Sequence, residues 1–259
     1  MLARNLELRL DPAAIMERAG MPPDPWQVRL LRSKAERTLL LCSRQSGKST
    51  VTAAMALHEV VFRPKSLVLL LSPSLRQSQE LFRKVTDFRE RLGESIPVAE
   101  ESALRVELKN GSRIVALPGT EETVRGFSGV RLLVVDEAAR VDDPLYYAIR
   151  PMLAVSGGRM VCLTTPSGKR GFFYEEWTGE GPWDRVRITA SECPRISEKF
   201  LAEERASLGE RWFLQEYCCS FEENEGGVFA YADIEAALDE SITPLFTEPL
   251  FGRVRQCHS

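Results

Sequence analysis

Short apolar runs alternate with segments of helical spacing through the central part of the chain. The runs are Arg37–Cys42, Ser66–Leu71, Arg131–Asp136, Arg159–Thr164 and Val186–Ala190. Continuous apolar runs of this kind are typical of strands buried on both faces of a parallel sheet. Between them, Ser49–Phe62 and the later part of Ser72–Arg91 carry apolar residues at helical spacing. The pattern predicts an α/β fold with a mainly parallel central sheet flanked by helices.

Two further segments alternate apolar and polar residues. Leu104–Leu108 and Arg113–Leu117 are separated by Lys109-Asn110-Gly111-Ser112. Because Asn-Gly is a strong signal for a tight turn between antiparallel strands, these segments predict a β-hairpin.

The pattern changes toward both ends of the chain. It predicts helices over Leu6–Ala19, Trp26–Ser33, Ser197–Leu208 and Glu210–Ser220. Asp11-Pro12 predicts a helix start within the first of these. We therefore expect three parts: an N-terminal helical segment over residues 1–36, a core over 37–190, and a small lid subdomain with a linker over 191–259.

Composition narrows the class of protein without identifying it. Of the 259 residues, 44% are hydrophobic and 27% charged, which is ordinary for a globular protein. We expect a cytoplasmic location and no membrane contact, because Met1–Leu10 lacks an apolar signal core and no apolar run approaches the roughly 20 residues of a membrane span. The net charge of −3 argues against a strongly basic nucleic-acid coat but leaves room for a local basic channel.

Cysteine and histidine positions do not indicate a metal site. None of the six cysteines forms a CxxC pair, and adjacent Cys218 and Cys219 fit no usual zinc spacing. The two histidines, His58 and His258, are far apart in the sequence. We expect reduced, mostly buried thiols and no histidine-based metal centre.

The segment Cys42–Thr50, with the sequence CSRQSGKST, lies between a predicted strand and a predicted helix. Its second half matches the phosphate-binding P-loop pattern GxxxxGK[ST], although Cys42 takes the position of the first glycine. A strand that leads into a helix N-terminus presents backbone N–H groups to phosphate. Lys48 would neutralise the β- and γ-phosphates, and Ser49 would offer a hydroxyl to Mg²⁺. The alternative is an ordinary strand–turn–helix in which Gly-Lys-Ser is incidental. Candidate nucleotide-binding residues here are Ser43, Arg44, Gln45, Ser46, Gly47, Lys48, Ser49 and Thr50.

Two carboxylates follow the apolar run Leu132–Val135. Asp136, at the carboxyl end of a predicted central strand, is a candidate Mg²⁺ ligand. Glu137 is a candidate base that orients and deprotonates an attacking water. The alternative is a surface pair that caps the next helix. An acidic strand end downstream of a P-loop predicts ATP and magnesium as ligands and ATP hydrolysis as the reaction.

These residues resemble the large terminase subunits, the DNA-packaging motors of tailed phages. Ser43–Ser49 is similar to the family's variant P-loop, which often lacks the first glycine. Other similar segments, in order along residues 20–220, are Pro25-Trp26-Gln27, Leu71–Ser78, Val124–Ser128, Asp136-Glu137-Ala138 and Leu163–Gly168. The resemblance implies a P-loop NTPase core of the RecA-like, ASCE type.

The resemblance also implies roles for single residues. Gln27, in the N-terminal segment, would read the adenine edge, and Arg44 would contact the γ-phosphate in cis. Thr164 and Thr165 would couple hydrolysis to movement. Arg140 would act as an arginine finger in a neighbouring subunit, with Arg125 as the rival. Each residue has a simpler alternative. Gln27 would be a solvent-facing residue of a helix, and the arginines would be surface charges or members of local ion pairs. The two threonine hydroxyls would only satisfy the hydrogen bonds of a strand end.

For the function of the assembled motor, the resemblance implies translocation of double-stranded DNA into a procapsid at its portal, in the cytoplasm of an infected host cell. It implies the portal protein and the small terminase subunit as partners, and a homo-oligomeric ring, pentameric by family. Large terminases usually carry a nuclease domain after the ATPase. No further carboxylate-bearing strand pattern follows Ile242, so we expect a lone ATPase domain with no DNA cleavage.

Basic residues gather on or beside the predicted hairpin. The candidates for gripping DNA phosphates are Arg105, Lys109, Arg113 and Arg125. The alternative for each is the polar face of an edge hairpin, where lysine and arginine discourage aggregation.

Two other functions fit the motifs. Asp136-Glu137-Ala138-Ala139 resembles the DExx box of superfamily-2 helicases, so a helicase or translocase fragment is one alternative, although such enzymes carry two RecA-like lobes. The other is a nucleotide-gated assembly module that binds ATP and oligomerises without turnover.

Overall fold

The computed structural model describes residues 2–93, 96–119, 124 and 126–222 of the chain. The described strands form one eight-stranded sheet in the order β3-β4-β5-β2-β6-β7-β1-β8. The strands are β1 (Arg37–Cys42), β2 (Leu67–Ser72), β3 (Val98–Glu101), β4 (Arg105–Leu108), β5 (Arg113–Pro118), β6 (Val130–Asp136), β7 (Arg159–Thr164) and β8 (Asp184–Ile188). From β5 to β8 along this order, neighbouring strands are parallel. The predicted α/β fold with a mainly parallel sheet is confirmed.

The antiparallel edge of the sheet contains the predicted hairpin and one strand that the sequence pattern missed. β4 and β5 pair antiparallel across the Asn-Gly turn. The Asn110 side chain stabilises this turn by accepting the Ser112 N–H at 2.9 Å, and Gly111 has a φ of +79°. β3 pairs with β4, but its sequence VAEE has only two apolar residues and is mostly exposed, so it forms no apolar run that would predict a buried strand.

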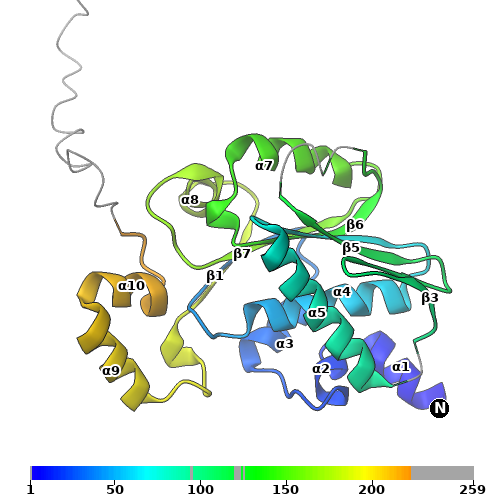
Figure 1. Ribbon diagram of the computed structural model, residues 1–259, viewed down its shortest axis with the longest axis horizontal. Coiled ribbons are helices and arrows are strands. Elements are labelled where there is room, and N and C mark those ends of the chain that lie inside the picture. The colour runs from blue at the N-terminus through cyan, green and yellow to red at the C-terminus, as the bar shows by residue number, and fades with distance from the viewer. Residues whose placement is uncertain (1, 94–95, 120–123, 125, 223–259) are drawn as a thin grey trace, which may run out of the picture. The chain divides into compact units, whose positions relative to one another are not determined.

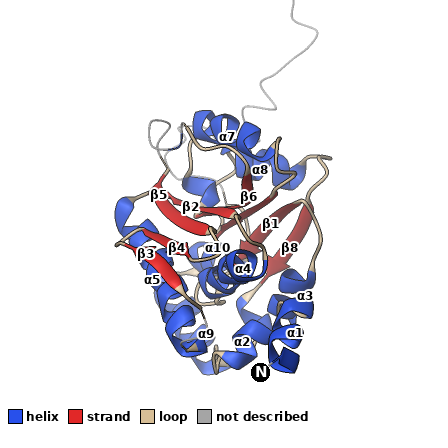
Figure 2. Cartoon of the chain, turned by 90° about the vertical axis from the view of Figure 1, so that its right-hand side faces the viewer, coloured by secondary structure: helices blue, strands red, loops and turns tan. Residues whose placement is uncertain are grey.

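Helices cover both faces of the sheet. Alternate residues of β1 enter two separate cores: Leu40 packs into one, and Leu39 and Leu41 pack into the other. Figures 1 and 2 show α1–α5 on one side of the sheet and α7 and α8 on the other. These helices are α1 (Leu2–Leu10), α2 (Ala14–Arg18), α3 (Pro25–Arg32), α4 (Lys48–Phe62), α5 (Leu75–Leu92), α7 (Asp143–Ile149) and α8 (Gly171–Thr178), with short 3₁₀ turns η1 (Ala138–Arg140), η2 (Arg150–Leu153) and η3 (Ala190–Glu192).

The helix predicted over Leu6–Ala19 is wrong in one respect: the structure has two helices, α1 and α2, with a break after Leu10. Pro12 lacks the N–H that a continuous helix needs. Asp11 stabilises the break, because its Oδ1 accepts the Ala13 N–H at 3.1 Å and its carboxylate pairs with Arg32 at 2.6 Å.

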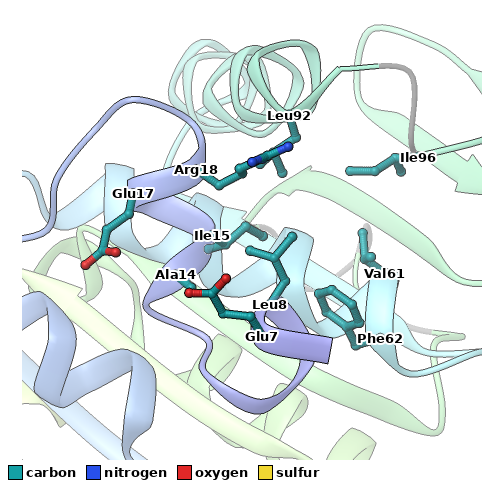
Figure 3. A pocket seen from close by; sticks show the side chains of 10 residues that line it. All are labelled: Glu7, Leu8, Ala14, Ile15, Glu17, Arg18, Val61, Phe62, Leu92 and Ile96. Carbon is teal, nitrogen blue, oxygen red and sulfur yellow. The ribbon is translucent and has the colours of Figure 1, made fainter. Parts of the chain in front are cut away.

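A cavity of about 460 Å³ lies where α1 and α2 meet the C-terminal ends of α4 and α5 (Figure 3). Leu8, Ile15, Val61 and Phe62 give it an apolar lining, with Glu7, Glu17 and Arg18 also present. The predicted phosphate loop, called the phosphate loop below, is the segment of residues 43–47 that directly precedes α4. Because α4 has 15 residues, its far end is about 20 Å from that loop. The cavity is therefore separate from the site described below.

The last described elements are α9 (Glu198–Leu208) and α10 (Glu210–Cys218), close to the two predicted helices. They carry a small core of their own in which Phe213 and Tyr217 pack with Ala190. Residues up to Glu222 form one compact unit, and the predicted boundaries at residues 36 and 190 stay predictions. Residues 223–259 of the predicted 191–259 segment lie outside the described residues. None of the described helices combines the length and the apolar character of a membrane span.

Candidate nucleotide-binding site

Three strand ends bring the predicted motifs together at one edge of the sheet. β7 lies between β1 and β6, so the loop after Cys42, the carboxylate of Asp136 and the hydroxyl of Thr164 belong to adjacent parallel strands. The three strands end at the same level of the sheet, because Leu41 of β1 lies opposite Thr164 of β7 and Asp136 of β6 lies opposite Leu163 of β7. The carboxyl edge of a parallel sheet is where α/β proteins usually bind ligands.

The phosphate loop has the backbone that its sequence predicts. Gly47 has a φ of +89° and is followed at once by α4, whose N-terminus carries the positive end of the helix dipole. A Cβ atom on Gly47 would lie 2.8 Å from Gln27 Nε2 and 3.1 Å from Arg195 Nη2. Both the dihedral angle and this close approach favour glycine. Cys42, at the first-glycine position, is fully buried, and burial raises the pKa of its thiol.

Hydrogen bonds from four distant segments hold the backbone of this loop. They are Ser43 N–H to Ile188 O (2.9 Å), Arg44 N–H to Glu216 O (2.9 Å), Arg195 Nη2 to Ser46 O (3.0 Å) and Gln27 Nε2 to Gly47 O (3.3 Å). Together they fix the loop from β8, α10, the segment after η3, and α3. The result is a preorganised cradle for an anion.

Glu137 is an acid held by two cations at the site. Its Oε1 lies 2.8 Å from Lys48 Nζ, and its Oε2 accepts from Arg140 Nη1 at 2.5 Å. Its backbone is left-handed, with φ 50° and ψ 42°. Such a conformation costs a non-glycine residue about 1–3 kcal/mol and is concentrated at functional sites. The predicted lysine and acid are therefore in direct contact.

Asp136 is a buried carboxylate beside the loop. Its side chain accepts the Glu137 N–H at 2.9 Å, and its Oδ2 lies 3.5 Å from Ser49 Oγ. Burial raises the pKa of Asp136 to about 6, and nearby Lys48 opposes that shift. A carboxylate and a hydroxyl that converge in this way are hard oxygen ligands, so Ser49 and Asp136 fit a magnesium ion.

We expect Asp136→Asn to stabilise the metal-free protein. Folding raises the Asp136 pKa from 3.8 to about 6, so the folded state binds the carboxyl proton more tightly than the unfolded state does. The protonated carboxyl therefore stabilises the fold below pH 4, and this stabilisation is lost as the pH rises through 6. The penalty at neutral pH is about 3 kcal/mol at most. Urea unfolding in EDTA should show the variant about 1–3 kcal/mol more stable near pH 7.5, with the difference shrinking near pH 4.5. A wild-type protein as stable as the variant near pH 7.5 would contradict this expectation.

Gln27 lies where an adenine reader is expected, but both ends of its amide are engaged. Its Nε2 donates to Gly47 O, and its Oε1 accepts the Asp24 N–H at 2.9 Å in the capping box that begins α3. The side chain lines a cavity of about 500 Å³ next to Gly47 and Thr50. Reading a base with this amide therefore requires it to exchange at least one of these bonds.

Arg44 and Thr165 line one pocket beside Lys48 and Glu137, and Thr164 precedes Thr165 at the end of β7. Arg44 lines a pocket of about 340 Å³ together with Lys48, Glu137, Arg140 and Thr165, and also Gln45 and Gln77. Arg140 Nη1 also lies 3.4 Å from Thr165 Oγ1. The Thr164 hydroxyl accepts the Ala139 N–H at 3.3 Å and donates to Thr165 O at 2.7 Å. The threonines therefore connect the end of β7 to the turn that carries Arg140.

The three candidate DNA-binding residues that the structure describes do not join this cluster. Arg113 begins β5 opposite Leu67, the first residue of β2, and Lys109 lies in the preceding turn. Both are exposed, at the amino-terminal edge of the sheet and thus away from the phosphate loop. Arg105 pairs with Glu107 at 2.6 Å. Arg125 lies outside the described residues.

Sequence reasoning missed three charged residues that contact the site. Asp24 is buried and pairs with Arg195 through two bonds, at 2.9 and 2.7 Å, and Glu216 pairs with Arg44 at 2.6 Å. Asp24 had a signal, because Asp-x-x-Gln before a helix is a variant of the capping box. Arg195 and Glu216 had none, since each meets its partner across more than 140 residues of sequence.

A strand–loop–helix unit with an acidic strand end beside it, on a mainly parallel sheet, gives the chain a fold of the RecA-like, ASCE type. Residues 39–236 match the family described as "Terminase large subunit, T4likevirus-type, N-terminal". The chain belongs to this family, as its motifs predicted, and the helicase-type alternative is not supported at the family level.

Comparisons with individual proteins agree with this assignment. The chain is 29% identical to the terminase large subunit of Thermus virus P23-45 over 264 aligned positions, which cover 87% of the chain and 54% of that protein. It thus spans about half the length of this curated relative. The ATPase domain of the Thermus phage P74-26 large terminase has the same fold, with a TM-score of 0.69, 22% identity, and coverage of 80% of this chain and 97% of that one. The large terminase of a thermophilic bacteriophage, solved in complex with ADP, gives a TM-score of 0.64 at 12% identity, over 77% of this chain and 54% of that chain.

Proposed function

We propose that this chain is the ATPase motor domain of a viral terminase large subunit and that it hydrolyses ATP with magnesium. The observation that carries the proposal is the contact between Lys48 and Glu137, beside the paired oxygens of Ser49 and Asp136. This arrangement supports the proposal because it gathers a cation, a carboxylate and a pair of hard oxygen ligands around the N-terminus of one helix, as phosphoryl transfer requires. The large terminase of the thermophilic bacteriophage has been solved with ADP, which supports nucleotide as the ligand.

Each side chain has a defined task in this proposal. Backbone N–H groups of the loop and Lys48 bind the phosphates, and Ser49 and Asp136 would hold the metal ion. When bound, magnesium would neutralise charge on the phosphate oxygens. Lys48 leaves Glu137 Oε1 as it moves to the phosphates, and that oxygen then orients the attacking water and accepts its proton.

The two arginines of the pocket act on the terminal phosphate from different chains. Arg44 contacts it in cis, because it lies on the same loop as Lys48. Arg140, whose side chain is 37% exposed, leaves Glu137 to reach a neighbouring subunit's nucleotide. Thr164 and Thr165 transmit the resulting shift of the Arg140 turn to β7. This requires a neighbouring subunit, and we propose a homo-oligomeric ring, with five subunits as in the family.

In this proposal, ATP hydrolysis drives the translocation of double-stranded DNA into a procapsid in the host cytoplasm. The portal protein and the small terminase subunit are the proposed partners. The exposed side chains of Lys109 and Arg113 are proposed to touch the DNA backbone, at an edge of the sheet opposite the nucleotide. We propose no DNA cleavage by the residues of this chain.

The proposal is tested by phosphate release from ATP over a range of protein concentrations, with magnesium or with EDTA, and with or without linear duplex DNA. We expect magnesium-dependent release whose rate per subunit rises with concentration, because Arg140 acts in trans. Nucleotide binding without release under every condition, including with duplex DNA, would instead favour a nucleotide-gated assembly module.

A further inference from the structure

The pocket of about 340 Å³ that contains Lys48 and Glu137 is also lined by a side chain from α5. This side chain is Gln77, in the first turn of the helix. α5 follows β2, and β2 is the neighbour of β6 in the sheet. The loop after β2 therefore reaches the same edge as the end of β6, where Glu137 is located. Gln77 adds a neutral amide to a pocket in which most other side chains are charged.

Ser74, the N-cap residue of α5, holds both the backbone of Gln77 and one end of its amide. Ser74 Oγ accepts the Gln77 backbone N–H at 3.3 Å and donates its own hydrogen to Gln77 Oε1 at 2.9 Å. The start of the helix is itself anchored to the sheet, because Ser78 Oγ donates to the carbonyl oxygen of Leu117, in β5, at 2.8 Å. The Gln77 amide is therefore oriented before any ligand binds.

The bond from Ser74 leaves Nε2 as the end of the amide that is available in the pocket. Among the described residues, Nε2 of Gln77 has no hydrogen-bond partner. An amide nitrogen has two N–H donors and no acceptor, so it can hold the oxygen of a water molecule but cannot take its proton. Glu137 has the complementary property, because a carboxylate accepts hydrogen bonds and protons and donates neither. The two side chains together satisfy both sides of one water molecule.

We propose that Gln77 is a catalytic residue that orients the attacking water by donating an N–H from Nε2 to the water oxygen. The inference rests on the proposed function, since it assigns Gln77 to the same reaction. One lone pair of the water accepts this N–H, and the other attacks the phosphorus of the terminal phosphate. Glu137 accepts a proton from the water as the new P–O bond forms, and the electron pair of the breaking P–O bond stays with ADP. Gln77 neither gains nor loses a proton; it fixes the direction of attack.

The test is to measure kcat and KM for ATP, with magnesium, in Gln77→Met and in the wild-type protein. Methionine is neutral and close to glutamine in size but has no N–H donor, and the backbone bond to Ser74 is retained. We expect kcat to fall about 10- to 100-fold and KM to change less than about twofold, because only the reacting water loses a contact. The dissociation constants for ADP and for a slowly hydrolysed ATP analogue should be unchanged, which also shows that the variant is folded. In the Glu137→Gln background, Gln77→Met should cause no further loss, because both residues act on one water molecule.

Gln79→Met is the matched control. Gln79 is also an exposed glutamine of α5, but it lines a different cavity, together with Phe82 and Glu101, so its replacement should leave kcat unchanged. The inference is overturned if Gln77→Met is as fast as this control, or if it lowers kcat equally in the Glu137→Gln background. Weaker analogue binding would also overturn it, because Gln77 would then contact the phosphate rather than the water. A wild-type protein that releases no phosphate would refute the proposed function as well, whereas the other outcomes refute only the role of Gln77.

Discussion

Replacing Glu137 by glutamine should lower the rate of ATP hydrolysis about 10³-fold while nucleotide binding is retained. Glutamine preserves the size of the side chain but cannot accept a proton from water at neutral pH. The variant also loses the ion pairs to Lys48 and Arg140, which leaves Lys48 available to the phosphates. We therefore expect nucleotide affinity that is equal to or higher than that of the wild-type protein. Phosphate release and a fluorescent-nucleotide titration measure the two properties on the same sample.

Glu107→Gln is the matched control for this variant. Glu107 is also an ion-paired glutamate, with Arg105 at 2.6 Å, but it lies on β4 in the antiparallel edge of the sheet. Its replacement should leave hydrolysis within a few-fold of wild type. If Glu137→Gln hydrolyses ATP as fast as this control, Glu137 is not the base.

Replacing Lys48 by alanine should weaken binding of ATP and ADP at least about 100-fold, which corresponds to roughly 2.7 kcal/mol. Lys48 is the first residue of α4, and its side chain is only 13% exposed. Its ammonium group is thus held in a partly desolvated site, where its attraction to phosphate is stronger than in bulk water. The titration used for Glu137→Gln measures this loss directly.

Lys199→Ala gives the corresponding control. Lys199 lies on α9, its side chain is 86% exposed, and it pairs with Glu203 at 3.8 Å. Nucleotide binding by this variant should be unchanged. Should Lys48→Ala bind ATP as well as Lys199→Ala does, the loop would not be a phosphate site. A thermal unfolding curve for each variant separates loss of binding from loss of fold.

The elements that were predicted well have one property in common: the residues that specify each of them are neighbours in the sequence. β1 and β7 have the predicted bounds, and α4 begins one residue earlier than expected, because an uninterrupted apolar run or a Gly-Lys-Ser turn specifies local structure by itself. β3 was missed because Val98–Glu101 has only two apolar residues and becomes a strand only by pairing with β4. The Asp11-Pro12 signal was recognised, but it marks a break between two helices rather than the start of one.

The candidate site divides in the same way. Lys48, Ser49, Asp136 and Glu137 were identified because their strands and their loop are local features, and parallel strand ends must meet at one edge of the sheet. Their individual roles stay predictions until the variants are measured. The partners of Gln27 and Arg44 were not identified, and these contacts change what each residue can do. Gln27 is engaged at both ends of its amide, and Arg44 is held through Nε.

The sequence by itself determined the class of fold and the family, and it placed Lys48, Ser49, Asp136 and Glu137 together around the phosphate loop. It could do so because the burial pattern of a strand and the residues of a turn are local features of the sequence. The tertiary structure alone decided how that loop is held. Arg195 reaches Ser46 O, and Glu216 reaches Arg44, across 149 and 172 residues of chain. A single sequence carries no signal for such pairs, because they form only when helices and loops outside the central sheet pack against it.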